Sequence, residues 1–398
     1  MNPGHRGTRE TLESSYGYAR EKGLATWDPF DVKGCALSLW TYRSRFGAPV
    51  RKALHAADLL APRLLRKSLR LKPVPSAGGV ARWLQASLAM SRLRRREGET
   101  DETEMREARA AMDWLALDAR PGPAGMGWGL PFDWQAFVVV PAGAPIGHTT
   151  MAVLNALQDA REEGIEPDPS LLASGADFLT GGLNHTVREL GSVALSYTAL
   201  DHSQVINTNA EIAAVLMRLG RKADQPLVQA LVQFVLESQN PDGSWFYSAP
   251  DAGEGRQVVD NYHTGMILTA LMELVAEYPE IGPALEKGWR FHLDGHFEPG
   301  GCPKMRPHSR WPVDAYSAGE SVLALLRAEC CETLEHGLRA ECREVRDRLV
   351  GFIVREMAYP GGGFFYRQWP VATMRLDSLR WANALLCQAL AEACLAEA

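Results

Sequence analysis

A polar cluster that opens an apolar helix recurs along the chain, each time after a loop rich in glycine and aromatic residues. The clearest copy has the loop 239–245, QNPDGSW, then the cluster 260–265, DNYHTG, and an apolar segment over 266–275. The cognate helix openings contain positions 148, 209, 263, 317 and 380, at successive spacings of 61, 54, 54 and 63 residues. A repeat just above the usual solenoid range indicates helical hairpins stacked as a ring or an array.

Segments rich in Ala, Leu, Arg and Glu at helical spacing are abundant, and strand-like alternation is scarce. The spacing predicts charged outer helices at about 51–70, 101–119, 168–181, 223–238, 280–296 and 333–357. It predicts apolar inner helices at about 78–93, 146–160, 207–219, 260–277, 314–329 and 377–396. Six pairs close an all-α (α/α)6 toroid, so we predict one toroid domain over residues 51–398 and an N-terminal arm over residues 1–50.

The loops between these helices are unequal in length. The segments that lead from an outer to an inner helix are long: 120–145, 182–206, 239–259, 297–313 and 358–376. The connections from an inner to an outer helix are short. We therefore expect the long loops to crowd one rim of the toroid, which points to that rim as the functional face.

The composition is that of an ordinary globular chain, with 398 residues of which 46% are hydrophobic and 23% charged. No apolar run approaches the roughly 18 residues of a membrane span, and residues 1–23 lack the apolar core of a signal peptide. Seven cysteines without CxxC spacing predict neither a disulfide framework nor a zinc ribbon. These features favour a cytoplasmic protein in a reducing compartment.

The charge is unevenly distributed. The whole chain has a net charge of −6, but residues 43–96 contain 14 Lys/Arg and a single acidic residue, Asp58. Such a basic, leucine-rich stretch is consistent with peripheral docking to an anionic inner-membrane surface, with binding of an anionic polymer, or with a solvated outer helix face. We do not expect nucleic-acid binding, because no recognised motif accompanies the charge and the chain as a whole is acidic.

The helix openings and long loops carry residue types suited to a polar binding site. His, Tyr and carboxylate groups transfer protons near neutral pH, and helix N-termini favour anionic groups. The candidate catalytic residues are His263, Tyr262, Asp314, Glu211 and Asp133. The candidate substrate-binding residues are Trp128, Trp134, His148, Asn207, Asn209, Trp245, Asp260, Tyr316, Asp377 and Arg380.

Structural roles are open for several of these residues. Asp260 and Asp314 suit helix N-cap positions, and the loop aromatics could pack the loops onto the toroid. His263, Cys302, His308 and Asp314 could meet around a metal ion only if adjacent loops fold inward, so we expect no metal and no cofactor. The chain contains no GxSxG, Walker or GxGxxG motif, which removes support for nucleophile-elbow, P-loop and Rossmann chemistry.

Two family resemblances rest on these motifs. Residues 239–245 resemble the QW repeat of squalene and terpene cyclases and of protein prenyltransferases, which are α/α toroids. Residues 260–264 are similar to the prenyltransferase segment that bears a zinc-binding histidine, here His263. The Asp-x-Cys ligand pair that precedes this histidine in the prenyltransferases is not found upstream of it, and the DxDD acid motif of class II cyclases is absent.

The broader resemblance is to the VpsJ-type polysaccharide biosynthesis proteins of bacterial exopolysaccharide clusters. Segments 27–31, 127–135, 260–265 and 312–318 resemble that family's landmarks in order. This chain departs from the pattern at Tyr316, where a histidine is expected. The resemblance implies a toroidal, cytoplasmic-side factor in surface-polysaccharide production.

Three functions follow as hypotheses. The first is a carbohydrate-active enzyme that epimerises or cleaves an acidic, nucleotide-linked or lipid-linked sugar, with His263 or Tyr262 transferring a proton and Arg380 holding the acidic group. Hydrolysis by paired carboxylates such as Asp133 and Asp314 is its variant. The second is a cyclase-like or prenyltransferase-like protein that binds an isoprenoid. The third is a non-catalytic scaffold that binds polysaccharide or membrane-linked glycan.

Overall fold

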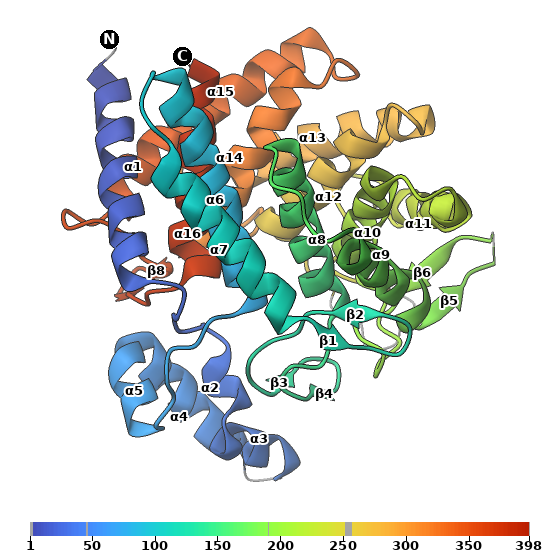
Figure 1. Ribbon diagram of the computed structural model, residues 1–398, viewed down its shortest axis with the longest axis horizontal. Coiled ribbons are helices and arrows are strands. Elements are labelled where there is room, and N and C mark those ends of the chain that lie inside the picture. The colour runs from blue at the N-terminus through green and yellow to red at the C-terminus, as the bar shows by residue number, and fades with distance from the viewer. Residues whose placement is uncertain (1–2, 45–46, 190, 251–256, 398) are drawn as a thin grey trace.

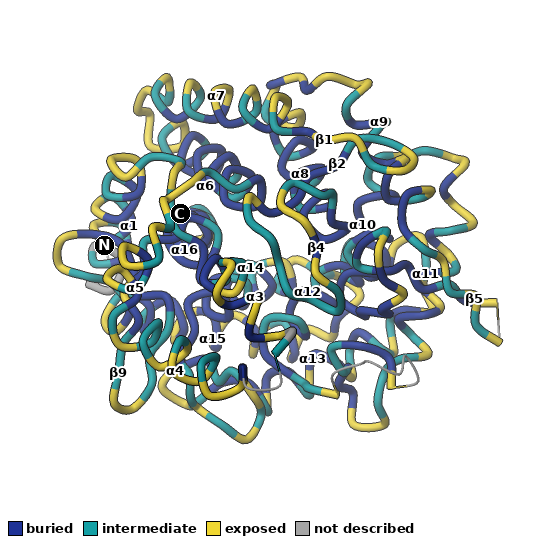
Figure 2. The backbone as a smooth tube through the Cα atoms, turned by 90° about the horizontal axis from the view of Figure 1, so that it is seen from below, coloured by how far each residue is buried: buried dark blue, intermediate teal, exposed yellow. Residues whose placement is uncertain are grey.

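Six inner helices form a closed ring. The computed structural model describes residues 3–44, 47–189, 191–250 and 257–397. The inner helices are α6 (Ala77–Arg96), α8 (Gly147–Glu162), α10 (Ile206–Leu219), α12 (Asn261–Leu274), α14 (Ala315–Cys330) and α16 (Ala384–Glu397). Each packs on the next, and α16 packs on α6, so the ring closes (Figure 2). The predicted all-α toroid is confirmed.

Six outer helices surround this ring. Five of them follow an inner helix directly: α7 (Glu102–Asp118), α9 (Pro169–Asp177), α11 (Gln225–Glu237), α13 (Gly282–His296) and α15 (His336–Phe352). The sixth is α1 (Pro3–Lys22), which packs on α16 at the opposite end of the chain. Figure 2 shows the outer helices around the inner ones, which are mostly buried.

The sixth outer position differs from the sequence-based expectation. Residues 1–50 were expected to form an arm and 51–70 the first outer helix, but α1 occupies the outer place. It buries Leu12, Tyr16 and Ala19 at helical spacing. The Tyr16 ring stacks on Trp83 of α6 at 4.8 Å, and its hydroxyl donates to Glu107 of α7 at 2.8 Å. These contacts tie the N-terminal helix to the first hairpin.

Four helices between residues 31 and 68 form a small lobe. It consists of α2 (Asp31–Gly34), α3 (Ala36–Arg43), α4 (Gly47–Leu60) and α5 (Pro62–Ser68), and it lies at the same end of the toroid as β3 and β4 (Figure 1). Arg66 is fully buried in it and donates to the carboxylates of Asp31 and Asp58. It also donates to the Asp28 carbonyl at 3.0 Å, so one guanidinium joins α5 to the segments before and after α2.

Short strands lie in the long loops, and single helical turns lie in the connections or at the ends of helices. The strands are β1 (Arg120–Pro121), β2 (Met126–Gly127), β3 (Trp134–Gln135), β4 (Val139–Val140), β5 (His185–Val187), β6 (Val193–Leu195), β7 (Val313–Asp314), β8 (Arg367–Trp369) and β9 (Ala372–Met374). They pair as β1–β2, β3–β4, β5–β6 and β7–β8–β9, all antiparallel. The remaining turns are η1 (Phe178–Gly182), η2 (Lys222–Asp224), η3 (Pro279–Ile281), η4 (Ile353–Met357) and η5 (Leu379–Asn383).

The repeated loop tryptophans anchor the loops to the outer helices. The Trp245 indole donates to the Val235 carbonyl of α11 at 2.9 Å, and the Trp128 indole donates to the Leu115 carbonyl of α7 at 2.7 Å. The Trp245 ring packs so closely on Gly288 of α13 that a Cβ there would lie 2.6 Å from it. Both indoles are buried, so the aromatic part of the repeat holds the hairpins together.

Among the helices of the described residues, none combines the length and apolar character needed to cross a membrane.

Replacing Arg66 by Met should destabilise the protein by about 3–5 kcal/mol in urea unfolding, because it leaves Asp31 and Asp58 without their buried cation. The deficit should grow as the pH rises. Burial raises the pKa of Asp31 to about 7, although Arg66 opposes this shift. Without the arginine the pKa of folded Asp31 rises further, while the pKa in the unfolded chain stays the same. Rising pH ionises the acid more readily in the unfolded chain, so the free energy of unfolding falls. The control is Arg63→Met, which removes a half-exposed arginine paired with Asp377 and should cost less than about 1 kcal/mol. Equal losses in the two variants would contradict the bracing role of Arg66.

Candidate active site

A cavity of 570 Å³ lies where the inner helices begin, under the long loops. The openings of α8, α10, α12, α14 and η5 contribute His148, Asn207, His263, Tyr316 and Arg380 to its wall. The location of the long loops at this rim agrees with the expectation from loop length. Eight aromatic side chains besides the histidines line the cavity: Phe30, Trp134, Phe137, Tyr197, Tyr247, Tyr262, Tyr316 and Trp381.

His263 is held by a carboxylate. Asp260 caps α12, accepting from the His263 backbone N–H at 3.1 Å, and its other oxygen lies 2.7 Å from His263 Nδ1. The imidazole packs between Tyr247 and Tyr262, with ring centroids at 4.7 and 4.1 Å. Since Nδ1 is engaged by Asp260, Nε2 is the nitrogen left for a ligand. A carboxylate behind an imidazole fixes its tautomer and stabilises the protonated form.

A second imidazole lies in the same cavity. His148 Nδ1 is 3.6 Å from a carboxylate oxygen of Glu211, and the ring lies parallel to Tyr197 with centroids 6.3 Å apart. The Asn207 side-chain amide donates to the same Glu211 oxygen at 3.2 Å. The Glu211 carboxylate therefore lies near His148 without a hydrogen bond to Nδ1, whereas Asp260 engages His263 Nδ1 directly.

The cavity carries more basic than acidic side chains. Lys33, Arg306, Arg367 and Arg380 line it, against Asp28 and Asp260. Asp28 accepts from the Trp381 indole at 2.9 Å, and burial raises the pKa of its carboxyl. A ligand that carries a negative group would offset the excess positive charge of the cavity lining.

Arg380 is the basic group best placed for such a ligand. Within the described residues it forms no ion pair, although its charge acts on the Asp28 carboxylate, and its guanidinium lies over the Trp381 ring, 4.6 Å from the centroid. Its side chain runs along α6 at Gly78, where a Cβ would lie 3.1 Å from Arg380 Cδ. Arg367, by contrast, is already paired with the buried carboxylate of Asp314.

The cavity tyrosines are poor bases. Burial raises the pKa values of Tyr197, Tyr262 and Tyr316 above the usual value for a phenol, so these side chains keep their protons. Tyr262 and Tyr316 pack edge to face at 5.2 Å. Their hydroxyls can donate hydrogen bonds to a ligand, and proton abstraction is left to the histidines.

Several candidate residues from the sequence lie outside the cavity lining. Asp314 caps α14 and binds Arg367, and Asp133 accepts from the Ala142 backbone N–H. Asn209 bonds to the backbone of Leu195 and Val205. Asp377 accepts from Tyr18 and Arg63, and Trp128 and Trp245 anchor loops. The pair Asp133 and Asp314, proposed for hydrolysis, does not converge on the cavity.

Part of the cavity wall was not predicted from the sequence. Tyr197, Tyr247, Arg306, Arg367 and Trp381 line the cavity but come from irregular loops, from the short strand β8 or from the turn η5. Only Trp381 could have been suggested by the sequence, because it directly follows the candidate residue Arg380. The other four depend on how each long loop folds back over the ring.

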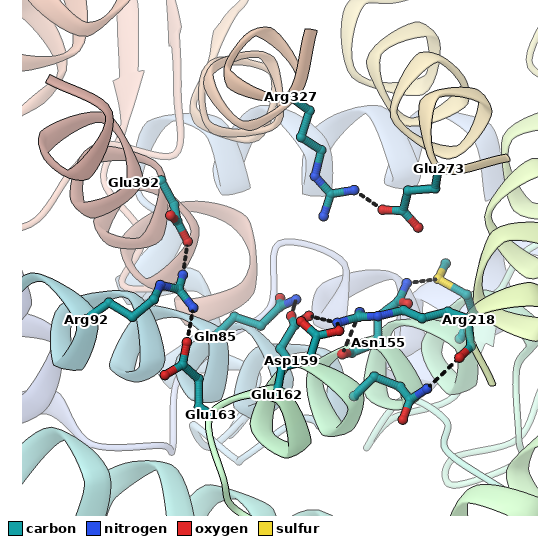
Figure 3. Close-up of polar contacts among 12 residues, drawn as sticks. Gln85, Arg92, Asn155, Asp159, Glu162, Glu163, Arg218, Glu273, Arg327 and Glu392 are labelled. Carbon is teal, nitrogen blue, oxygen red and sulfur yellow. Dashed lines mark hydrogen bonds and ion pairs between the residues drawn. The ribbon is translucent and has the colours of Figure 1, made fainter. Parts of the chain in front are cut away.

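The opposite end of the ring differs from this cavity. A second cavity of 530 Å³ adjoins the first at His148, Thr149, Met266, Tyr316 and Arg380. Near its far end, ion pairs link neighbouring inner helices: Arg92 with Glu163 and Glu392, Arg218 with Asp159, and Arg327 with Glu273 (Figure 3). Basic groups there are matched by acids, whereas Arg380 at the loop end is not.

Across the described ranges, no group of three or more His, Cys, Asp or Glu side chains is arranged to hold a metal ion.

Comparison with known proteins identifies the fold. A sugar epimerase from a ruminal bacterium has a TM-score of 0.58 and 14% identity, covering 80% of this chain and 87% of its own. An unsaturated glucuronyl hydrolase specific for heparin has a TM-score of 0.59 and 13% identity, covering 82% and 88%. A type II terpene cyclase from Scytonema has a TM-score of 0.58 and 12% identity, covering 99% of both chains. This chain has the fold of the α/α-toroid enzymes.

No protein-family model and no curated protein sequence matches this chain. The likeness to the toroid enzymes therefore lies in the fold alone.

Asp260 both caps α12 and holds His263 Nδ1, and two substitutions separate these roles. Asp260→Asn keeps an N-cap oxygen, so the melting temperature should change little, whereas Asp260→Ala should cost about 1 kcal/mol of stability. Both variants remove the carboxylate from His263 Nδ1. In Asp260→Asn the amide can donate to that nitrogen, which should shift the neutral imidazole toward the Nε2–H tautomer. Nitrogen-15 NMR of labelled histidine measures this shift, and an unchanged tautomer would contradict the orienting role.

Proposed function

We propose that the protein is an enzyme that acts on an acidic sugar by proton transfer at the carbon next to the carboxylate. The observation that carries the proposal is the juxtaposition, in one cavity, of an arginine outside any ion pair of the described residues and two histidines, His263 bonded to Asp260 and His148 near Glu211. The aromatic walls suit the CH faces of sugar rings, and the tyrosine hydroxyls suit their polar groups. Arg380 would bind the sugar carboxylate.

The chemistry follows from the charges. Nε2 of His263 takes the proton from the carbon next to the carboxylate, and the electron pair of the broken C–H bond moves into the carboxylate. The second negative charge develops beside Arg380, where a fixed cation is most effective. If His148 returns a proton from the other face, the configuration at that carbon inverts. If a substituent on the neighbouring carbon leaves with its bonding pair instead, the product is an unsaturated sugar.

The biological setting we propose is bacterial exopolysaccharide production. It rests on the order of segments 27–31, 127–135, 260–265 and 312–318, which resemble the VpsJ-type proteins. The departure at Tyr316 does not remove a base from the proposed scheme, because His263 and His148 supply two.

An isoprenoid ligand is the second candidate, favoured by the eight aromatic side chains of the cavity wall. The unpaired Arg380 could hold a diphosphate as well as a carboxylate. Geranylgeranyl diphosphate should then raise the melting temperature, whereas the sugar proposal expects this rise from uronic-acid ligands. A non-catalytic glycan scaffold would bind the uronic-acid ligands without turning them over.

Exchange with solvent tests the proposed reaction. The protein is incubated in deuterated water with uronic-acid oligosaccharides and nucleotide-linked uronic acids of each common configuration. We expect deuterium next to the carboxylate, detected by proton NMR and as a mass increase. Loss of one base should abolish inversion but leave exchange in one of the two epimers, so His263→Asn and His148→Asn should fail on opposite epimers.

Arg380→Met should slow exchange of both epimers by about 100-fold or more, since it removes the cation beside the developing charge. His202→Asn, an exposed histidine outside the cavity lining, is the matched control and should behave as wild type. New ultraviolet absorbance would indicate elimination. Absence of exchange and of absorbance with every sugar would overturn the proposal.

A further inference from the structure

The helical lobe of α2–α5 and the segment after it gather exposed apolar side chains. Of the eleven large hydrophobic residues exposed in the described chain, six lie between positions 37 and 74. They are Leu37, Trp40, Tyr42, Leu60, Leu64 and Val74, and Leu60 and Leu64 are 72% and 67% exposed. Exposed apolar side chains gathered in one short part of a folded chain are typical of a surface that binds a protein, a ligand or a membrane.

The exposed groups of α4 follow the period of a helix. Pro49, Ala53, Ala56 and Leu60 are all exposed, at spacings of four, three and four residues, so they share one face of α4. Leu64, in α5, is exposed as well, beyond the non-helical Ala61 that separates the two helices. Figure 2 shows exposed stretches along α4 and α5, on the side viewed from the loop end. The lobe thus presents an apolar helical stripe that nothing in the described structure covers.

Basic side chains accompany this stripe. Between residues 36 and 74 the sequence has nine Lys/Arg and one acidic residue, Asp58. Asp58 is not available to balance the surface, because it binds the buried Arg66. Lys52, Lys67, Arg70 and Lys72 are exposed. The lobe surface is therefore both apolar and strongly cationic, although the chain as a whole carries a net negative charge.

We propose that this lobe docks on a bilayer that contains anionic lipids. A helix that lies in the membrane interface needs an apolar face, here residues 49–60, and basic groups at its margins to meet anionic headgroups. Trp40 and Tyr42 are the residue types that anchor at the interface. An anionic polymer would account for the lysines but would leave Leu60 and Leu64 exposed to water, so the lipid surface accounts for more of the lobe.

Docking through the lobe would place the cavity beside the membrane. The lobe lies at the loop end of the toroid, and Phe30 and Lys33, at the start of the lobe, line the 570 Å³ cavity (Figure 1). Resting on the proposed function, this placement identifies the substrate class as an acidic sugar carried on a membrane lipid. The docking itself is independent of the reaction, because it depends only on the lobe surface.

Vesicle flotation tests the docking without any substrate. The full-length protein is mixed with vesicles of equimolar phosphatidylglycerol and phosphatidylcholine, or of phosphatidylcholine alone. We expect it to float with the anionic vesicles only, and less as salt is raised. Lys52→Glu with Lys67→Glu, and separately Leu60→Asp with Leu64→Asp, should each weaken binding by about tenfold or more.

The matched control is Arg109→Glu with Leu117→Asp on α7, a basic and an 83% exposed apolar residue remote in sequence from the lobe. It should float as wild type, and circular dichroism should show every variant folded. No flotation, or flotation that the lobe variants do not weaken, overturns the proposal. Binding to dextran sulfate in place of vesicles would identify a polymer surface and overturn it too. Failure here leaves the exchange experiment unaffected, so the two proposals fail separately.

Discussion

The site depends on one constraint of the ring: its six inner helices run in the same direction. Short turns join each inner helix to its outer partner and long loops return the chain, so the inner N-termini gather at one end. Free backbone N–H groups at those N-termini carry partial positive charge. Asp260 and Asp314 meet part of this charge as caps, yet Arg306 and Arg380 add more. A negatively charged ligand group would be favoured there, as the proposed function requires.

Features that depend on residues close together in the chain could be predicted from the sequence. The helical period and the polar openings predicted the ring, the caps at Asp260 and Asp314, and the end that carries the cavity. The sequence was misleading where contacts are long-range: α1 reaches its place only through α16, at the other end of the chain, and this displaced residues 51–70 into the lobe. It was also misleading for Trp128 and Trp245, because an aromatic loop residue looks the same whether it anchors a loop or faces a ligand.

The two ends of the lumen differ in how their charges are paired. At the far end, arginines and carboxylates of neighbouring helices neutralise one another and link the inner helices (Figure 3). At the loop end, Arg380 is left without an acidic partner in the described chain, and the carboxylates of Asp260 and Glu211 lie beside imidazoles instead. Arg380, half-buried and outside any ion pair of the described residues, is therefore free to bind a negatively charged ligand group.

The most direct test of this account is a crystal structure of the protein with an acidic sugar bound. The sugar carboxylate should lie within hydrogen-bond distance of the Arg380 guanidinium. The adjacent ring carbon should lie next to His263, whose Nδ1 should still be held by Asp260. A sugar bound in the far cavity, or one whose carboxylate avoids Arg380, would contradict this account.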